Sequence, residues 1–490
     1  MNEPIEQMTS HGGPGLGYGV KIMYGVGEIA NSIKVVTFGL YSLFFATAVM
    51  GLPGTWVGVV GLFAMVWDAV IDPYIGYLTD GARAASRRYD FMFTGALTMG
   101  AGFWAFFDPP RNLSTVTLFA WLLAASFVVR TATSMYSIPY AAIGVNLSQD
   151  YHERTSITAI RGMASTIGTL LTASLSFVLF FPDKVPGVDP KLNPAGYASM
   201  GLTFGLVMSV VALTAVLGTL PLRNRQRSHS DQAEQPAGDF FAAMWRFLHN
   251  PSVRVTLICS SLGVMALAIN SSLLVHYLKY YVEINGSVAL SASQGVFFGA
   301  GLLGTVFWLR ISSKFEKSRL YVFSAAATSA LMLASLPLFG KGHPLGTGDV
   351  RPLLVGYGVV GFFNCILWFI PQSMLADVAD ENELITGRRR EGALLGMFSF
   401  GQQVATGLAI LTAGVLLDKF VGLVAGGSQP SPLAAFRIAI VYSVVPGALF
   451  MAAAFVMLRY KLTRARVATI QAELRQRRSV QIALKAGVGL

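Results

Sequence analysis

Long apolar segments alternate with short polar connections along almost the whole chain. A segment of about 20 mainly apolar residues is long enough to cross a bilayer as a helix. The pattern predicts about twelve such helices, at 22–50, 54–79, 92–107, 115–146, 157–181, 197–220, 255–281, 291–312, 320–339, 352–376, 393–417 and 433–458. The chain is therefore predicted to be an all-α integral membrane protein.

The longest hydrophilic connection, residues 221–254, follows the sixth predicted helix. It separates an N-terminal six-helix half, 1–220, from a C-terminal six-helix half, 255–458, and a basic tail, 459–490, follows. Two six-helix halves joined by a central loop are typical of the major facilitator fold. The number of helices and the position of this loop favour that fold class.

Charged residues are few and unevenly placed. They make up 12% of the 490 residues, against about 25% in soluble proteins. The net charge of +11 comes from basic residues in alternate connections and in the tail, which the positive-inside rule places in the cytoplasm. We therefore expect a multi-pass protein of the inner membrane with both termini cytoplasmic, monomeric and surrounded by lipid, and no nucleic-acid partner.

Two aspartates interrupt the second predicted helix. Asp68 and Asp72 are four residues apart, a spacing that places both on one helix face. A carboxylate at the bilayer centre costs several kcal/mol, roughly 2.5–3.5 on insertion scales. Two of them so close together are expected to share a proton or hold a cation, which is the chemistry of an ion-coupling site. A structural ion pair with Arg130 or Arg161 is the alternative.

An arginine interrupts the fourth predicted helix. Arg130, Ser134 and Ser137 follow an i, i+4, i+7 spacing and so share one face. An arginine inside the membrane needs an anionic partner. That partner is either the pair of aspartates in the second helix or a carboxylate or phosphate on a substrate, and the sequence leaves both open.

Several motifs, spread over nearly the whole chain, point to one family. They are YGVGE at 24–28, WDAVIDP at 67–73, SIPY at 137–140, DYHERT at 150–155, HYLKYY at 276–281 and MLADVAD at 374–380. With them, the chain resembles the glycoside–pentoside–hexuronide:cation symporters, the melibiose permease group of the major facilitator superfamily. The DYHERT motif and the stretch from Ala376 to Gly392 are closer to the bacterial branch near the lysophospholipid symporters.

The resemblance implies symport coupled to H⁺ or Na⁺ by alternating access, with no other cofactor. Asp68, Asp72 and Ser134 correspond to the cation-binding positions, which would hold Na⁺ in a sodium-coupled transporter. Ile71 stands where melibiose permease has an asparagine. A hydrocarbon side chain removes one of the oxygen ligands that sodium needs, so protons are the favoured coupling ion.

The resemblance also implies a substrate site. Asn31, Ser32, Ser137 and Gln403 replace family residues that contact sugar or are essential, and Arg161 resembles an arginine near the substrate. With Arg130 added, these are the expected substrate-binding residues. Because the replacements are uncharged, galactoside recognition of the melibiose permease type is not expected. The expected substrate is another glycoside or related small solute, and a lysophospholipid or other amphiphile is the alternative.

Charged residues at the cytoplasmic ends of the helices are expected to form a gate. Gly76 to Gly81 and the arginines that follow resemble the major facilitator loop signature, with Gly81 where an arginine is usual. The expected gate residues are Asp80, Arg83, Arg154, Asp377, Asp380 and Arg389, and solvated loop charges are the alternative. The chain has no H-E-x-x-H motif, nucleophile elbow or Cys/His cluster, so it is not expected to be an enzyme.

Overall fold

The computed structural model describes residues 16–79, 84–148, 150–183, 189–222, 245, 247–312, 314–387, 391–423, 426 and 429–487. Almost all of these residues are helical, and they contain no strand. Polar residues begin many of the helices: the side chains of Ser114, Asn193, Asp349 and Ser431, for example, accept hydrogen bonds from backbone N–H groups of the first turn.

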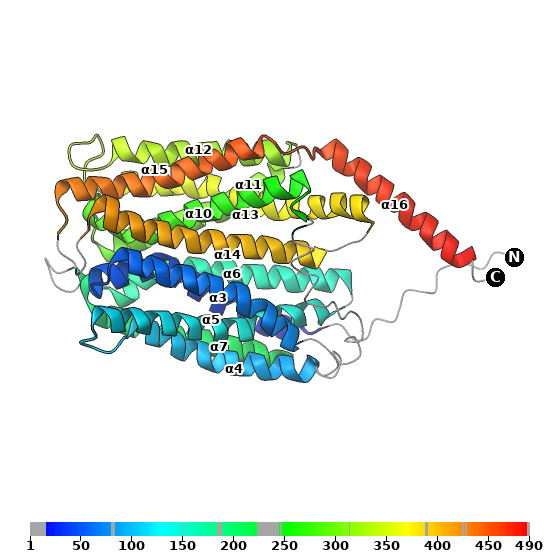
Figure 1. The fold of residues 1–490 in the computed structure, drawn as a ribbon, viewed down its shortest axis with the longest axis horizontal. Helices are drawn as coiled ribbons and strands as arrows, with labels where there is room; N and C mark the ends of the chain where they lie inside the picture. Colours follow the sequence, from blue (N-terminus) through cyan, green and yellow to red (C-terminus); the bar gives the residue numbers. More distant parts are fainter. Residues whose placement is uncertain are drawn as a thin grey trace.

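The helices form two bundles (Figure 1). The N-terminal half contains α1 (Tyr18–Val26), α2 (Glu28–Phe44), the π-helical η1 (Phe45–Val49), α3 (Gly54–Thr79), α4 (Ala84–Phe107), α5 (Thr115–Asn146), α6 (Tyr151–Phe180) and α7 (Pro194–Thr219). The C-terminal half contains α10 (Pro251–Tyr280), α11 (Ser287–Ser312), α12 (Lys317–Leu338), α13 (Val350–Thr386), α14 (Glu391–Leu416), the π-helical η5 (Leu417–Val421) and α15 (Pro432–Met457). Short 3-10 helices, η2 (Pro190–Leu192) and η3 (Leu220–Leu222), precede and follow α7, and α16 (Arg464–Gly487) ends the described chain.

Eleven of the described helical segments are long and apolar enough to cross a membrane. The twelfth predicted span corresponds to α4, which begins earlier than expected and carries Arg87, Arg88 and Asp90 near its start. It packs along α5 and α7 inside the N-terminal half, so it completes that bundle even though it is less apolar than its neighbours. The prediction of an all-α fold is confirmed for the residues that the structure describes.

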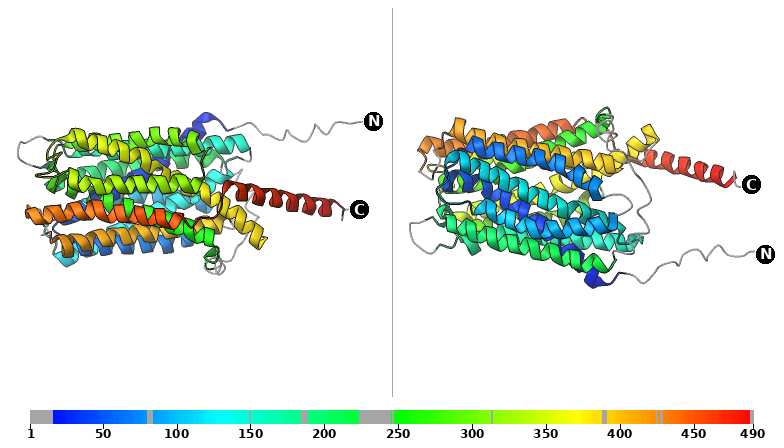
Figure 2. Two further views of the ribbon diagram at one scale, coloured as in Figure 1. Left: turned by 90° about the horizontal axis from the view of Figure 1, so that it is seen from above. Right: turned by 60° about the horizontal axis from the view of Figure 1, so that its bottom comes forward.

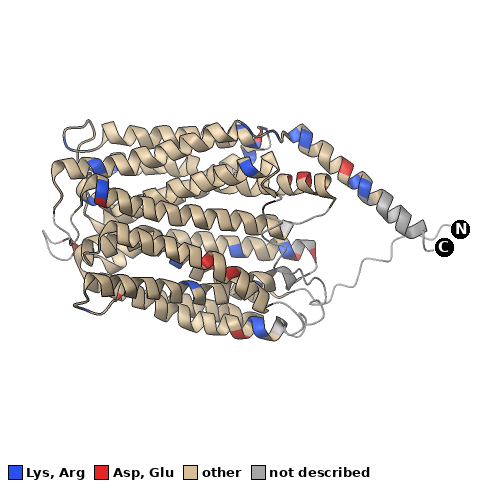
Figure 3. Ribbon diagram, in the orientation of Figure 1, with Lys and Arg blue, Asp and Glu red and all other residues tan. Residues whose placement is uncertain are grey.

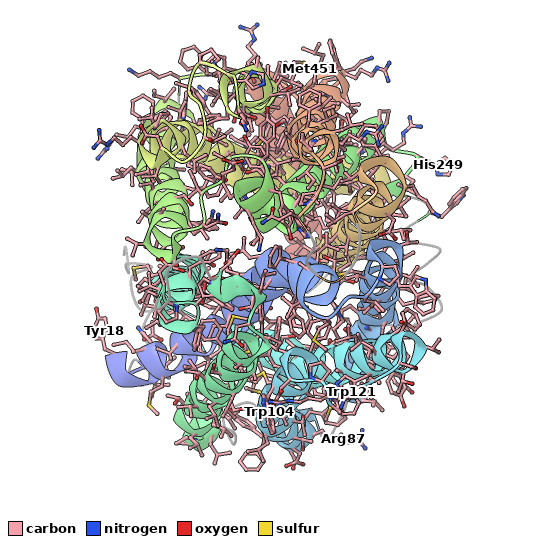
Figure 4. The ribbon with its side chains drawn as sticks, turned by 90° about the vertical axis from the view of Figure 1, so that its left-hand side faces the viewer. Tyr18, Arg87, Trp104, Trp121, His249 and Met451 are labelled. Carbon is pink, nitrogen blue, oxygen red and sulfur yellow. The ribbon has the colours of Figure 1, made fainter. Side chains whose placement is uncertain are left out.

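Large apolar side chains cover the outside of both bundles. Leu303, Val355 and Val210 are each at least 60% exposed. Trp104 and Trp121 lie on the periphery of the N-terminal half when the molecule is viewed along the helices (Figure 4). A soluble protein would bury much of this surface, whereas lipid solvates it. The chain is a multi-pass integral membrane protein.

Charged residues gather toward the two ends of the bundle, and few lie in its middle (Figure 3). We call the end that carries the start of α1 and the start of α16 the terminal end (Figures 1 and 2). The opposite end, which carries η2 and η5, is the loop end.

The sequence of the basic tail, from Arg464 to Arg478, predicts an amphipathic helix on the membrane surface. In the structure the first part of α16 packs on the bundle, and the rest of this helix projects away from it (Figures 1 and 2). Ile470 and Leu474 of α16 are buried against an apolar cluster at the terminal end of the C-terminal half, which includes Val378 of α13 and Met397 of α14. Gln471 also donates a 3.0 Å hydrogen bond to Asp380. The apolar face of α16 is therefore used for packing on the bundle.

Within the described residues, the two halves meet mainly along three pairs of long helices: α3 with α14, α6 with α11, and α2 with α10. The first two pairs are equivalent if the halves are repeats, because each joins the second helix of one half to the fifth helix of the other. Such an interface between repeats is where transporters of this architecture place their binding sites.

Candidate functional site

The site is built around Asp68, which lies in the middle of α3 and is 7% exposed. Arg130 of α5, 8% exposed, forms an ion pair with Asp68 Oδ2 through its Nη1. Trp67 Nε1 donates a 2.8 Å hydrogen bond to Thr131 Oγ1 and fixes the register of α3 on α5. The other carboxylate oxygen, Oδ1, is buried without a hydrogen bond from any residue that the structure describes.

Asp72, one turn further along α3, has uncharged partners. Ser134 Oγ of α5 donates a 2.5 Å hydrogen bond to Asp72 Oδ1. Gln403 Nε2 of α14 donates a 3.0 Å hydrogen bond to Asp72 Oδ2. Within the described part of the chain, no basic side chain contacts Asp72. Because α14 belongs to the C-terminal half, this carboxylate also connects the two halves.

The two aspartates thus share a face, as the spacing predicts, and they interact electrostatically. Arg130 and Ser134 likewise share one face of α5, since both contact α3. Ser137 is half-buried and makes no hydrogen bond within the described residues. The sequence left two partners open for Arg130, an aspartate of α3 or an anionic group of a substrate. In the structure Arg130 pairs with the aspartate Asp68.

A cavity of about 80 Å³ lies between the halves, and Arg130 is part of its wall. Its lining comes from α2, α3, α4 and α5 on one side and from α10 and α14 on the other. The polar groups that reach it from the C-terminal half are the hydroxyls of Ser271, Ser272 and Thr406. The arginine therefore borders a space that lies between the two halves.

A second polar cluster lies nearer the terminal end of the N-terminal half. Arg161 Nε of α6 forms a 3.3 Å ion pair with Glu28 of α2, and Asn31 donates a 3.3 Å hydrogen bond to the same carboxylate. Ser32 donates a 3.0 Å hydrogen bond to the backbone oxygen of Ser165. The sequence also allowed an ion pair between Arg161 and the α3 aspartates. In this structure Arg161 pairs with Glu28 instead.

Lys34 is a residue that the sequence interpretation missed. It lies in α2, half-buried, and interacts electrostatically with Asp68, Arg130, Asp72 and Glu28. The signal was present, since a lysine within an apolar helix carries the same energetic cost that singled out Arg130.

The expected gate residues that the structure describes are Arg154, Asp377 and Asp380. Asp377 forms a 2.6 Å ion pair with Lys317 of α12, inside the C-terminal half, and Asp380 contacts the tail through Gln471. Arg154 Nε donates a 2.8 Å hydrogen bond to the backbone oxygen of Ser148. The remaining expected members, Asp80, Arg83 and Arg389, lie outside the described residues. A gate between the halves at this end stays a prediction.

The loop end is closed by polar contacts between the halves. Asp189, next to η2, forms ion pairs with Lys279 of α10 at 2.6 Å and with Lys191 at 2.8 Å. Asp418 of η5 accepts hydrogen bonds from the backbone N–H groups of Gly54 and Thr55, at 2.7 and 2.6 Å. These contacts hold the start of α3 and the α6–α7 connection against the C-terminal half.

Comparison with known proteins identifies the family. Residues 23–464 match the family model described as MFS/sugar transport protein. The chain belongs to this family. It is therefore a membrane transporter, and the expectation that it is not an enzyme is confirmed, as is the resemblance to glycoside–cation symporters of the major facilitator superfamily.

The relatives of this transporter are full-length matches of low identity. An uncharacterized symporter of Bacillus subtilis, YjmB, is 24% identical over 93% of the chain and 95% of its own length. The Salmonella typhimurium protein named "Putative sulfoquinovose importer" is 25% identical over 94% of the chain and 93% of its own length. The Escherichia coli protein named "Putative glycoside/cation symporter YagG" is 23% identical over 94% and 95%.

Solved structures share the fold. A D-xylose–proton symporter superposes with a TM-score of 0.61 and 14% identity, over 91% of this chain and 98% of that one. The nucleoside transporter NupG superposes with a TM-score of 0.58 and 16% identity, over 91% and 99%. At this identity the likeness concerns the arrangement of the helices alone.

Proposed function

We propose that this transporter moves a sugar-like solute together with a proton, and that Asp72 carries the proton. The single observation that supports this most is the environment of Asp72: an intramembrane carboxylate held only by the neutral donors Ser134 and Gln403 among the described residues. The sugar-like substrate is supported by the family and by the relatives' names.

Asp68 is less suited to the same task. Its charge is compensated by Arg130, and protonating it would leave the arginine as a buried unpaired cation. Protonation of Asp72 breaks no ion pair. A sodium ion at Asp72 would lack an oxygen ligand at Ile71, because that side chain is a hydrocarbon. These points favour the proton.

The position of Asp72 links proton binding to movement of the halves. The amide of Gln403 donates to a negatively charged oxygen, which is a stronger hydrogen bond than one to a neutral carboxyl group. Protonation therefore weakens a contact between α3 and α14. In an alternating-access transporter, a contact of this kind couples the ion to the conformational step.

The orientation follows from charge. The connections and tail at the terminal end are rich in arginine and lysine, so we place this end in the cytoplasm of an inner membrane, with both termini inside. The loop end then faces outward and is the closed end. Because both walls of the cavity come from one chain, we propose that a monomer in lipid carries out transport.

Proteoliposomes that contain a pH-sensitive dye test the proposal. Addition of a transported sugar is expected to acidify the lumen, and Asp72→Asn is expected to abolish this while sugar-for-sugar exchange continues. Asp108→Asn, at an exposed position outside the site, is the matched control. Uptake stimulated by sodium at fixed pH, with no dependence on a proton gradient, would overturn the choice of ion. Uptake of lysophosphatidylcholine in place of sugars would support the alternative substrate class.

A further inference from the structure

Lys34 lies on the face of α2 that lines the central cavity one turn further along the helix. Lys34, Phe38 and Ser42 are spaced four residues apart, so they lie on one face of the helix. Phe38 and Ser42 both line the cavity. The lysine is therefore placed one turn from the enclosed space, on its terminal-end side.

The ammonium group of Lys34 lies among charges without contacting one. It interacts electrostatically with Asp68 and Asp72 of α3, Arg130 of α5 and Glu28 of α2. It nevertheless makes no hydrogen bond or ion pair with any residue in the described ranges. From the C-terminal half, the cavity lining contributes only uncharged side chains.

Three acidic and three basic side chains lie in this region, and two ion pairs account for four of them. Asp68 is paired with Arg130, and Glu28 is paired with Arg161. One carboxylate and one ammonium remain, Asp72 and Lys34, and they are not in direct contact. While Asp72 is ionised, the set of six groups is formally neutral. Once Asp72 binds a proton, the set has one positive charge in excess, and the unpaired group is Lys34, one turn from the cavity.

We propose that Lys34 binds a single anionic group of the substrate, and that it does so when Asp72 is protonated. This inference rests on the proposed function and makes it more specific: the solute is a sugar acid with one negative charge. One proton and one monoanion enter together, so the loaded site has the same charge as the empty one. Such symport moves no net charge across the membrane.

Three probes of one size separate the possibilities: methyl glucoside, which is neutral, glucuronate, and the C6-sulfonate of glucose. We expect the two anions to be bound and carried in preference to the glucoside, and the preferred anion tells a carboxylate substrate from a sulfonate. Their proton-coupled uptake is expected to be unchanged when a potential is imposed with potassium and valinomycin. A neutral sugar carried with a proton would instead respond strongly to the potential.

Variants of Lys34 test whether this lysine is the group that binds the anion. Lys34→Gln is expected to weaken anion binding roughly ten- to hundred-fold, as for the loss of one charge-assisted contact. Lys34→Arg is expected to restore much of it, which a loss of folding would not allow. Lys341→Gln, a charge change at an exposed loop position, is the matched control and leaves binding unchanged. Asp72→Asn, which mimics the protonated carboxyl group, is expected to bind the anion equally well from pH 6 to pH 8.

The outcomes separate the two proposals. If no probe acidifies the lumen, the proposed function fails, and the inference fails with it. If methyl glucoside is carried with a proton and Lys34→Gln behaves like the wild type, the proposed function stands and the role of Lys34 is wrong. Anion uptake that accelerates under an inside-negative or inside-positive potential contradicts the one-to-one charge balance.

Discussion

Arg130 and Asp68 are both buried, and each compensates the charge that would otherwise make the other costly. Removing one partner of a buried ion pair leaves an unpaired charge and destabilises a protein by about 3–5 kcal/mol, whereas removing both costs far less. The two substitutions are therefore expected to be strongly non-additive.

We predict that Arg130→Gln lowers the thermal stability of the purified transporter markedly. Adding Asp68→Asn to it is expected to recover most of the loss, because the double variant has no unpaired charge at this position. Melting followed by tryptophan fluorescence in detergent measures both. A double variant that is less stable than either single one would show that the pair does more than compensate its own charges.

The charged residues of the site could be predicted from the sequence, but their contacts between distant helices could not. Asp68, Asp72 and Arg130 were predicted because charge inside an apolar helix has a known cost. The contact between Asp72 and Gln403 joins positions 331 residues apart, and it depends on how α3 packs on α14. No spacing rule contains that information. Arg161 was placed near the aspartates as an alternative, but Glu28 in the adjoining helix is nearer to it.

At the scale of whole helices, the contact between α3 and α14 is close because glycines line it. A Cβ atom on Gly414 would lie 2.1 Å from the backbone oxygen of Gly54, and one on Gly58 would lie 2.8 Å from Leu411 Cα. Backbone cannot yield as a flexible side chain can, so even a methyl group must separate the helices. This packing of small residues is how helices approach closely in lipid.

We predict that Gly414→Ala opens the loop end, since this contact lies next to the hydrogen bonds of Asp418 with the start of α3. Modification of cysteines introduced at the loop end by an impermeant reagent is expected to become faster, and transport to fall. Gly356→Ala in α13 is the control, because a Cβ atom there meets nothing within 4 Å. Unchanged labelling in Gly414→Ala would mean that the helices do not separate.

The helices themselves were largely predictable, since apolar length decides which segments cross a membrane. The pattern could not give the extension of α13 to Thr386 or the early start of α4, because hydrogen bonding continues a helix beyond its apolar part. It also could not predict that α16 packs on the bundle. An amphipathic helix has an apolar face, but the sequence does not say whether lipid or protein covers it.

At the scale of the whole molecule, an ion-pair network holds the loop end closed, although transport requires this end to open. Asp189 holds Lys279 of the C-terminal half and Lys191 of its own half, and Lys191 also donates a 2.7 Å hydrogen bond to the backbone oxygen of Asn285. An alternating-access cycle must break this network once per turnover. Its strength therefore contributes to how often the loop end opens, in addition to the effect of the proton on Asp72.

Burial alone would raise the pKa of Asp189, but Lys191 and Lys279 outweigh it and hold the pKa below its usual value of 3.8. In the open state the carboxyl group is in water and has its usual pKa. The ionised form is thus favoured by closure, and this contribution is fully present above about pH 4. It is lost only as the pH falls through the lowered pKa. Between pH 5 and pH 8, the contribution of Asp189 to closure of the loop end is therefore expected to be independent of pH.

Asp189→Asn removes the charge at every pH and leaves two buried ammonium groups facing each other. We predict that the open population rises roughly a hundred-fold or more, corresponding to about 3 kcal/mol or more for a broken buried pair. Distances between spin labels at positions 111 and 341, which lie in exposed loops of opposite halves at this end, measure the change. Asp108→Asn is the matched control. If the effect of Asp189→Asn on these distances instead changes between pH 5 and pH 8, the carboxyl group of Asp189 titrates in that range and the prediction is wrong.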